Sequence, residues 1–183
     1  MDYSNTYKKV SPSVVNVVQL DVNNKFCSAA SGVLIADGSK VLTCFHCVDA
    51  NLKNGILVDK SSGLVQLGSI LFFDKDNDIA ILDIGKSFGP SATLVSSSTV
   101  EIGNEIFTIG FPYSINSEKT LTTGNVAAFE NGGIKIDTSV NNGNSGGPLF
   151  NTKGEVIGIV NAKLGSLSNF LDNIEKAKPQ AFM

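Results

Sequence analysis

The chain has few of the residues that several classes of function require. Its 183 residues include one histidine, three cysteines and no tryptophan, and 14 basic against 17 acidic residues give a net charge of −3. Because the lysines are scattered and form no basic stripe, we expect no nucleic-acid partner. No apolar run approaches the roughly 18 to 20 residues that cross a bilayer, so we expect no membrane partner either.

The first residues lack the charged and apolar segments of a signal peptide. We therefore expect a cytoplasmic protein, or a secreted one if a leader has been removed. The length, with 42% hydrophobic residues, allows one or two small cores and leaves no room for an additional module. We predict a single domain over residues 1–183, with no internal repeat and no low-complexity segment.

Short runs rich in β-branched residues alternate with clusters of Gly, Asn, Asp and Ser. This pattern is typical of an all-β barrel or sandwich. Near the end, apolar residues recur at helical spacing from Leu167 to Ile174, which predicts a short C-terminal helix at about 167–178, before Pro179. The expected strands cover residues 14–20, 32–36, 41–43, 64–73, 79–84, 105–109, 120–128, 134–137 and 156–162.

The most specific chemical signal is the run 143–148, which reads Gly-Asn-Ser-Gly-Gly-Pro. Its glycines permit a tight turn and a close approach of substrate to the main chain. They also leave peptide N–H groups free to point at a developing oxyanion. By itself the run fits a glycine-rich turn with an incidental serine equally well. A serine nucleophile also needs a base, and the base needs a third group that orients it.

The one available base of the usual kind is His46, in an apolar stretch where a histidine is often a core residue. The best aspartate is Asp78, at the mouth of the buried-looking strand 79–84, where a carboxylate is partly shielded yet can reach an imidazole. Asp74 and Asp76 are more typical of solvated turn residues. The sequence therefore predicts a pairing of His46 with Asp78.

Three segments resemble the catalytic motifs of trypsin-like serine proteases. Residues 41–47 resemble the histidine signature, residues 78–82 the aspartate strand and residues 143–149 the nucleophile loop, in the family's order of His, Asp and Ser. The resemblance implies an all-β fold of two six-stranded antiparallel β-barrels with a short C-terminal helix. It places the N-terminal barrel at about 10–85, a linker at about 86–98, and the C-terminal barrel at about 99–164.

The chain resembles the HtrA (Deg-type) branch of that family most closely. HtrA proteases usually carry a PDZ domain after the protease domain, and this chain has no room for one. In that branch another strand usually precedes the C-terminal helix and helps to wall the specificity pocket. We find none at 163–167, so we expect either a natural chain that continues beyond Met183 or a pocket built differently. The landmarks of the branch are residues 11–17, 31–35, 109–112 and 154–159.

The resemblance implies a serine endopeptidase that uses no metal and no cofactor. In it, His46 takes the proton of Ser145, and Asp78 orients His46. The oxyanion hole falls on Gly143, Asn144 and Ser145, with the backbone N–H groups of the first and last as donors. HtrA-type enzymes can also hold this loop in an inactive form.

Residues before and after the nucleophile indicate the substrate preference. Ser139 stands where trypsin-like proteases that cut after basic residues carry an acidic one, and Val140 beside it is apolar. Asn161 and Ala162 would form another wall, and Lys163 could reach the rim and admit an acidic group. Because an apolar lining disfavours a charged side chain, we expect cleavage after small or medium aliphatic residues, as the resemblance also implies. Unfolded polypeptides expose such residues.

The cysteines leave other interpretations open. Cys44 and Cys47 form a Cys-x-x-Cys, which alone can indicate redox chemistry or zinc. A four-ligand zinc site would need Cys27, Cys44, Cys47 and His46, and would consume the base. In secreted members of the family the cysteine matching Cys47 pairs with one on the preceding strand, from which Cys27 is displaced by a few residues. Three cysteines and no leader favour free thiols.

Two other functions stay open beside an active protease with a polypeptide substrate. One is a protease-like module that binds a peptide or partner with little turnover. The other is a domain that becomes active only in an oligomer or with a C-terminal extension, since the HtrA family tends to form trimers. A homo-oligomer is thus among the expected partners.

Overall fold

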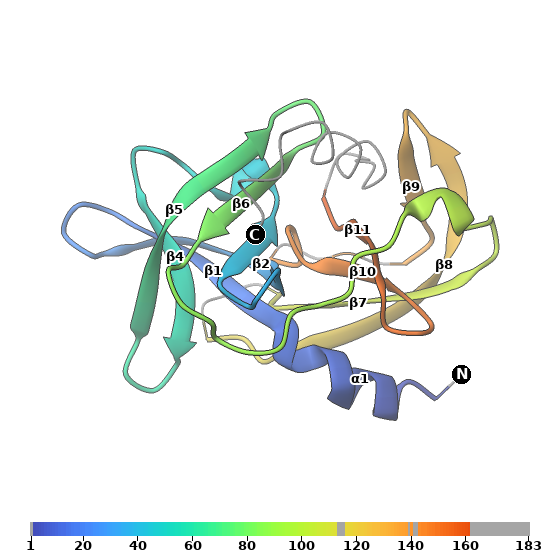
Figure 1. Ribbon diagram of the computed structural model, residues 1–183, viewed down its shortest axis with the longest axis horizontal. Helices are drawn as coiled ribbons and strands as arrows, with labels where there is room; N and C mark the ends of the chain where they lie inside the picture. The colour runs from blue at the N-terminus through green and yellow to red at the C-terminus, as the bar shows by residue number, and fades with distance from the viewer. Residues whose placement is uncertain (1, 113–115, 139, 141–142, 162–183) are drawn as a thin grey trace.

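The computed structural model describes residues 2–112, 116–138, 140 and 143–161 (Figure 1). Within them the regular structure is mostly β-strand, which confirms the predicted class. The expected helix at 167–178 lies outside the described residues. The helical elements are α1 (Ser4–Val10), η1 (Ser11–Ser13), η2 (Phe45–Cys47) and η3 (Ser97–Thr99). The strands are β1 (Val14–Leu20), β2 (Phe26–Ile35), β3 (Lys40–Thr43), β4 (Lys53–Asp59), β5 (Leu64–Asp74), β6 (Ile79–Asp83), β7 (Glu105–Gly110), β8 (Thr120–Glu130), β9 (Gly133–Ile136), β10 (Pro148–Asn151) and β11 (Val156–Ile159).

The first six strands close into an antiparallel barrel in the order β1-β2-β3-β6-β5-β4. Strands β3 and β6 are neighbours in the barrel, and their apolar residues are buried. Their register pairs Thr43 with Ala80. Because β3 ends where β6 begins, the turn after Thr43 lies next to the turn before Ile79. This register positions the two segments that carry His46 and Asp78.

The remaining strands form a five-stranded sheet in the order β11-β10-β7-β8-β9. One face buries a small cluster that includes Ile106 and Leu149. Toward the barrel, the rings of Phe107 and Phe150 stack with centroids 4.9 Å apart and belong to the main core. Six strands were expected here, and the described residues contain five. Strands β7, β10 and β11 contribute buried residues to both clusters, so this part of the sheet is covered on both faces.

The segment between the two sheets runs along the second one. The backbone N–H of Val95 donates to the carbonyl of Val156, and the N–H of Val156 donates to that of Thr93. Leu94 forms a parallel bridge with Val156. The predicted linker therefore continues the edge of the sheet beside β11.

Two strands and the N-terminal helix were absent from the sequence-based prediction. β4 contains Asn54-Gly55, a pair typical of turns. Its glycine is needed because a Cβ there would lie 2.3 Å from the carbonyl oxygen of Gln66 on the neighbouring strand. β10 has only four residues and begins with Pro148, which is tolerated as the first residue of a strand.

Helix α1 also lacks local signals, since it has no side-chain cap and no acidic residue in its first turn. Tertiary packing holds it: the ring of Tyr3, at the start of the helix, lies 4.9 Å from that of Phe107 in β7. In the part of the chain that the structure describes, no helix combines the length and the hydropathy needed to cross a membrane.

Candidate active site

His46 and Asp78 are in direct contact, held by the turns at the ends of β3 and β6. The ring Nδ1 of His46 lies 2.6 Å from Oδ2 of Asp78, and the backbone N–H of His46 donates to Oδ1 at 2.9 Å. The backbone N–H of Phe45 donates to the carbonyl of Asp78 at 3.1 Å. Asp78 has a φ of 55°, a conformation that aspartate tolerates better than most residues. One carboxylate thus fixes both the main chain and the ring of His46.

The two side chains differ in exposure in the way that proton transfer to a substrate requires. The side chain of Asp78 is 12% exposed and that of His46 is 48% exposed. When the ring is neutral and its Nδ1 proton is donated to the carboxylate, Nε2 is the ring atom with a free lone pair. The arrangement therefore provides an oriented imidazole base that solvent and ligands can reach.

The loop that carries Ser145 packs directly against the same corner of the barrel. A Cβ on Gly146 would lie 2.1 Å from Oγ1 of Thr43 and 2.2 Å from the carbonyl of Ser31. The backbone N–H of Ser31 donates to the carbonyl of Ser145 at 2.8 Å, and the N–H of Gly146 donates to that of Val160 at 2.7 Å. Only a glycine at 146, with its φ of 83°, allows this contact.

The hydroxyl of Ser31 holds this loop through hydrogen bonds, a role that the sequence did not reveal. Its hydroxyl donates to the carbonyl of Gly143 at 2.7 Å and accepts from the backbone N–H of Phe111 at 2.9 Å. Ser31 is fully buried, and the neighbouring Asn144 is 2% exposed. A serine before a glycine in a strand gives no signal of such a role, because both partners are distant in sequence.

The structure thus brings the predicted His46 and Asp78 together, and packs the loop of Ser145, Gly143 and Asn144 against the turn that carries the histidine. Their catalytic roles stay predictions. Of the five residues proposed for substrate binding, Ser139, Ala162 and Lys163 lie outside the described residues.

The other two, Val140 and Asn161, line one small cavity of about 70 Å³. This cavity adjoins the nucleophile loop, because the backbone N–H of Val160 donates to the carbonyl of Gly147 at 2.8 Å. Its lining is mostly aliphatic. The full set is Ile134, Ile136, Val140, Leu149, Gly158, Ile159, Val160 and Asn161.

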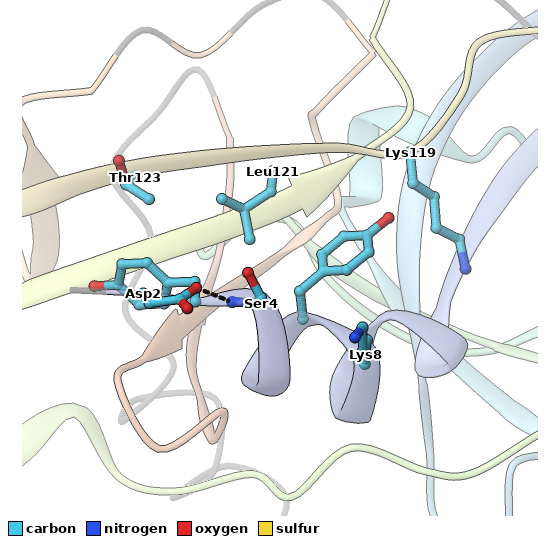
Figure 2. Close-up of a pocket in the computed structure, with 8 residues that line it drawn as sticks. Asp2, Ser4, Lys8, Lys119, Leu121 and Thr123 are labelled. Atoms are coloured by element: carbon cyan, nitrogen blue, oxygen red, sulfur yellow. Dashed lines mark hydrogen bonds between the residues drawn. The ribbon is translucent and has the colours of Figure 1, made fainter.

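A larger cavity of about 590 Å³ lies elsewhere, between α1 and β8 (Figure 2). It is open to solvent, and an Asp2 carboxylate that accepts from the N–H of Ser4 lies at one end. None of the candidate catalytic residues lines it, so its size does not make it the active site. Its lining residues are Asp2, Tyr3, Ser4, Tyr7, Lys8, Lys119, Leu121 and Thr123.

The thiols of Cys44 and Cys47 lie close to the ring of His46. All three cysteines are free, so the Cys27–Cys47 disulfide is not formed; Cys27 is exposed, whereas Cys44 and Cys47 are buried. A hydrogen bond with Cys47 and the charge of Cys47, followed by the hydrogen bond with Asp78 and its charge, raise the pKa of His46 to about 9 against the opposing effect of burial. Hydrogen bonds with Cys44 and His46 lower the pKa of Cys47 to about 6, again against burial. The hydrogen bond with Cys47, together with burial, raises the pKa of Cys44.

Comparisons with known proteins agree with this geometry. A family model described as a trypsin-like peptidase domain matches residues 30–159. Serine protease HTRA1 of Xenopus laevis is 31% identical over 175 residues, which are 86% of this chain and 37% of that protein. A probable periplasmic serine endoprotease, DegP-like, of Buchnera aphidicola is 35% identical over 154 residues, which are 78% of this chain and 31% of that protein. The chain therefore spans about a third of the length of these two relatives.

Solved structures give the same result. The crystal structure of Deg5 superposes with a TM-score of 0.77 at 26% identity, over 92% of this chain and 90% of that chain. The serine endoprotease from Yersinia pestis superposes with a TM-score of 0.78 at 26% identity, over 96% of this chain and 66% of that chain. The chain belongs to the trypsin-like peptidase family, and its domain is of the HtrA type.

Proposed function

We propose that this chain is a serine endopeptidase that hydrolyses peptide bonds with His46, Asp78 and Ser145. The observation that carries the proposal is the two-point contact of the Asp78 carboxylate with the ring and backbone of His46, beside the loop of Ser145. A turn needs only the backbone contact, whereas the second contact also orients the exposed imidazole of His46.

In the proposed reaction, Nε2 of His46 takes the proton of the Ser145 hydroxyl as its oxygen attacks the peptide carbonyl. The resulting imidazolium is stabilised by Asp78 and then gives its proton to the leaving amine. The backbone N–H groups of Gly143 and Ser145 stabilise the oxyanion. Removal of one such donor typically costs about 3 kcal/mol of transition-state stabilisation, so the loop conformation matters as much as the triad.

The small cavity lined by Val140 and Asn161 is the proposed pocket for the side chain before the cleaved bond. Its aliphatic walls would leave a charged side chain without compensation for its lost hydration, which supports a preference for small or medium aliphatic residues. Ser139, Ala162 and Lys163 stay proposed substrate-binding residues. Unfolded polypeptides, which expose aliphatic residues and extended backbone, are the substrates that we propose.

We also propose that the protein works in the cytoplasm and assembles with further copies of itself. The free thiols of Cys44 and Cys47 support a reducing compartment. The proposal of self-assembly rests on the resemblance to the HtrA branch.

The raised pKa of His46 favours a second function, a protease-like module that binds peptides with little turnover. Because the pKa of His46 is raised to about 9, its imidazole is mostly protonated at neutral pH and cannot accept the proton of Ser145. Such a protein would keep the fold and the pocket of a protease while it cleaves slowly.

Covalent labelling with a fluorophosphonate, followed by intact-mass measurement, separates these functions. We expect one adduct on the parent chain, none on Ser145→Ala, and an unchanged adduct on Ser62→Ala, a change of an exposed serine in the β4–β5 turn. Casein digestion by the same three proteins then measures turnover. Absence of an adduct on the parent across the range from neutral pH to above 9 would contradict an activated Ser145. An adduct without casein cleavage would favour the binding module.

A further inference from the structure

The side chains of Cys44, His46 and Cys47 form a cluster. The proposed reaction uses His46 but neither of the two thiols. Their ligand atoms, two thiol Sγ atoms and a ring nitrogen, all lie within 4.8 Å of one another. The backbone N–H of Cys47 donates to the carbonyl of Cys44 at 3.2 Å across the single turn of η2. This turn brings the three side chains close together.

We propose that this cluster binds one Zn²⁺ ion, or another soft divalent cation, and that the bound metal switches the protease off. Two cysteine thiolates and one histidine are an established donor set for a zinc ion that keeps its fourth position for water. The two cysteines also have the Cys-x-x-Cys spacing that zinc ligands commonly show. The switch rests on the proposed function, whereas metal binding does not.

The fourth ligand that the sequence seemed to require is not needed. Cys27 is exposed and does not belong to the cluster. His46 is half exposed, so water can reach a metal on its ring. Around a tetrahedral zinc ion, with metal–ligand bonds of about 2.0 to 2.3 Å, neighbouring ligand atoms lie roughly 3.5 to 4 Å apart. Binding of a zinc ion therefore requires the three side chains to move toward one another by about 1 Å.

The surroundings of the cluster favour a metal over an empty polar pocket. The Cys44 thiol is fully buried, donates to the carbonyl of Val160 at 3.3 Å and has a hydrogen bond with Cys47. A bound cation would take the place of the thiol proton and compensate the charge of the buried sulfur. When the metal binds Nε2, Asp78 at Nδ1 is the usual carboxylate partner of a metal-binding histidine.

Binding is a ligand exchange with no redox step. The metal forms bonds to both sulfur atoms and to one ring nitrogen and loses bound water, and the thiol protons pass to solvent. Coordination through Nε2 occupies the lone pair that would accept the Ser145 proton. Coordination through Nδ1 displaces Asp78 from the ring. In either case His46 cannot act as the base, so the metal-bound form is inactive.

The test is titration of the chelator-treated, phosphine-reduced full chain with Co²⁺, which gives intense thiolate-to-metal charge-transfer absorption. We expect one equivalent to bind, Zn²⁺ to displace it, and the band to weaken at least tenfold in Cys44→Ser and in Cys47→Ser. Cys27→Ser, the matched control, is expected to bind like the parent. Circular dichroism of each variant confirms that it is folded. No band in the parent, an unchanged band in the folded Cys47→Ser, or a lost band in Cys27→Ser would overturn the site.

A second measurement separates this site from the proposed function. Fluorophosphonate labelling of Ser145 is followed on the same proteins with and without one equivalent of Zn²⁺. We expect Zn²⁺ to slow labelling of the parent at least tenfold and to have less effect on Cys44→Ser. A charge-transfer band on a parent that never labels contradicts the protease, not the metal site. Labelling that Zn²⁺ leaves unchanged in a protein with the band overturns the switch.

Discussion

The substitution Ser31→Ala tests whether this buried hydroxyl holds the nucleophile loop. It removes two hydrogen bonds at once, the donation to the Gly143 carbonyl at 2.7 Å and the acceptance from the Phe111 N–H at 2.9 Å. Phe111 is buried, so its N–H group loses a partner that water cannot replace. An unpaired buried polar group costs about 1–3 kcal/mol.

Loss of the hydrogen bond to the Gly143 carbonyl costs less, because this residue is partly exposed and water can hydrate its carbonyl. The two losses together lower the free energy of unfolding by about 2–4 kcal/mol. The loop also loses the contact that orients Gly143, a proposed oxyanion donor. Loss of one such donor costs about 100-fold or more in rate, so a loosened one is expected to slow labelling of Ser145 roughly 10-fold or more.

Urea unfolding measures the first effect, and the rate of fluorophosphonate labelling of folded protein measures the second. Ser28→Ala is the control: it lies on the same strand, and its hydroxyl donates one hydrogen bond, to Gln19 at 2.5 Å. We expect it to cost about 1 kcal/mol and to leave labelling unchanged. If Ser31→Ala unfolds like the parent, the assigned bonds are wrong. If it is destabilised but labels at the parent's rate, the loop does not depend on Ser31.

Three further predictions follow from the site. Asp78→Asn lowers the rate of casein cleavage about 10³- to 10⁴-fold, because an amide does not hold the His46 ring in the tautomer that carries its proton on Nδ1. Equal cleavage by the folded mutant and the parent would contradict the triad. Cys47→Ala removes the largest cause of the raised pKa of His46, and activity needs the neutral ring. The labelling rate of the metal-free variant should therefore rise with pH around a midpoint below the parent's pKa of about 9. An unchanged midpoint would contradict the contact between Cys47 and His46. Gly146→Ala puts a Cβ 2.1 Å from an atom of β3, whereas Gly63→Ala, also at positive φ, meets nothing within 4 Å. In urea unfolding the first should cost more than about 3 kcal/mol and the second about 1–2, and equal costs would refute the tight packing.

Much of the barrel could be predicted from the sequence because its strands carry their own signals. The run 14–20 matches β1 residue for residue, and the expected strands at 41–43 and 79–84 differ from β3 and β6 by one residue each. These runs are apolar, β-branched and bounded by turn residues. β4 was missed because the requirement for Gly55 comes from the neighbouring strand, which no local pattern reports.

The same division holds within the site. The residue types around His46, Asp78 and Ser145 mark them as candidates, because nucleophilic catalysis needs those chemical groups. Their proximity depends on the register that pairs Thr43 with Ala80, and on Gly146, which lets the loop approach the barrel.

The sequence by itself determined the class of fold, most of the strands and the identity of the reactive groups, since short-range periodicity and side-chain chemistry encode them. Only the tertiary structure decided which groups meet. It joined Ser31 to Gly143 across 112 positions, and gathered Cys44, His46 and Cys47 while leaving Cys27 outside. Contacts of this kind arise from the packing of two sheets against each other, and no segment of the chain carries that information alone.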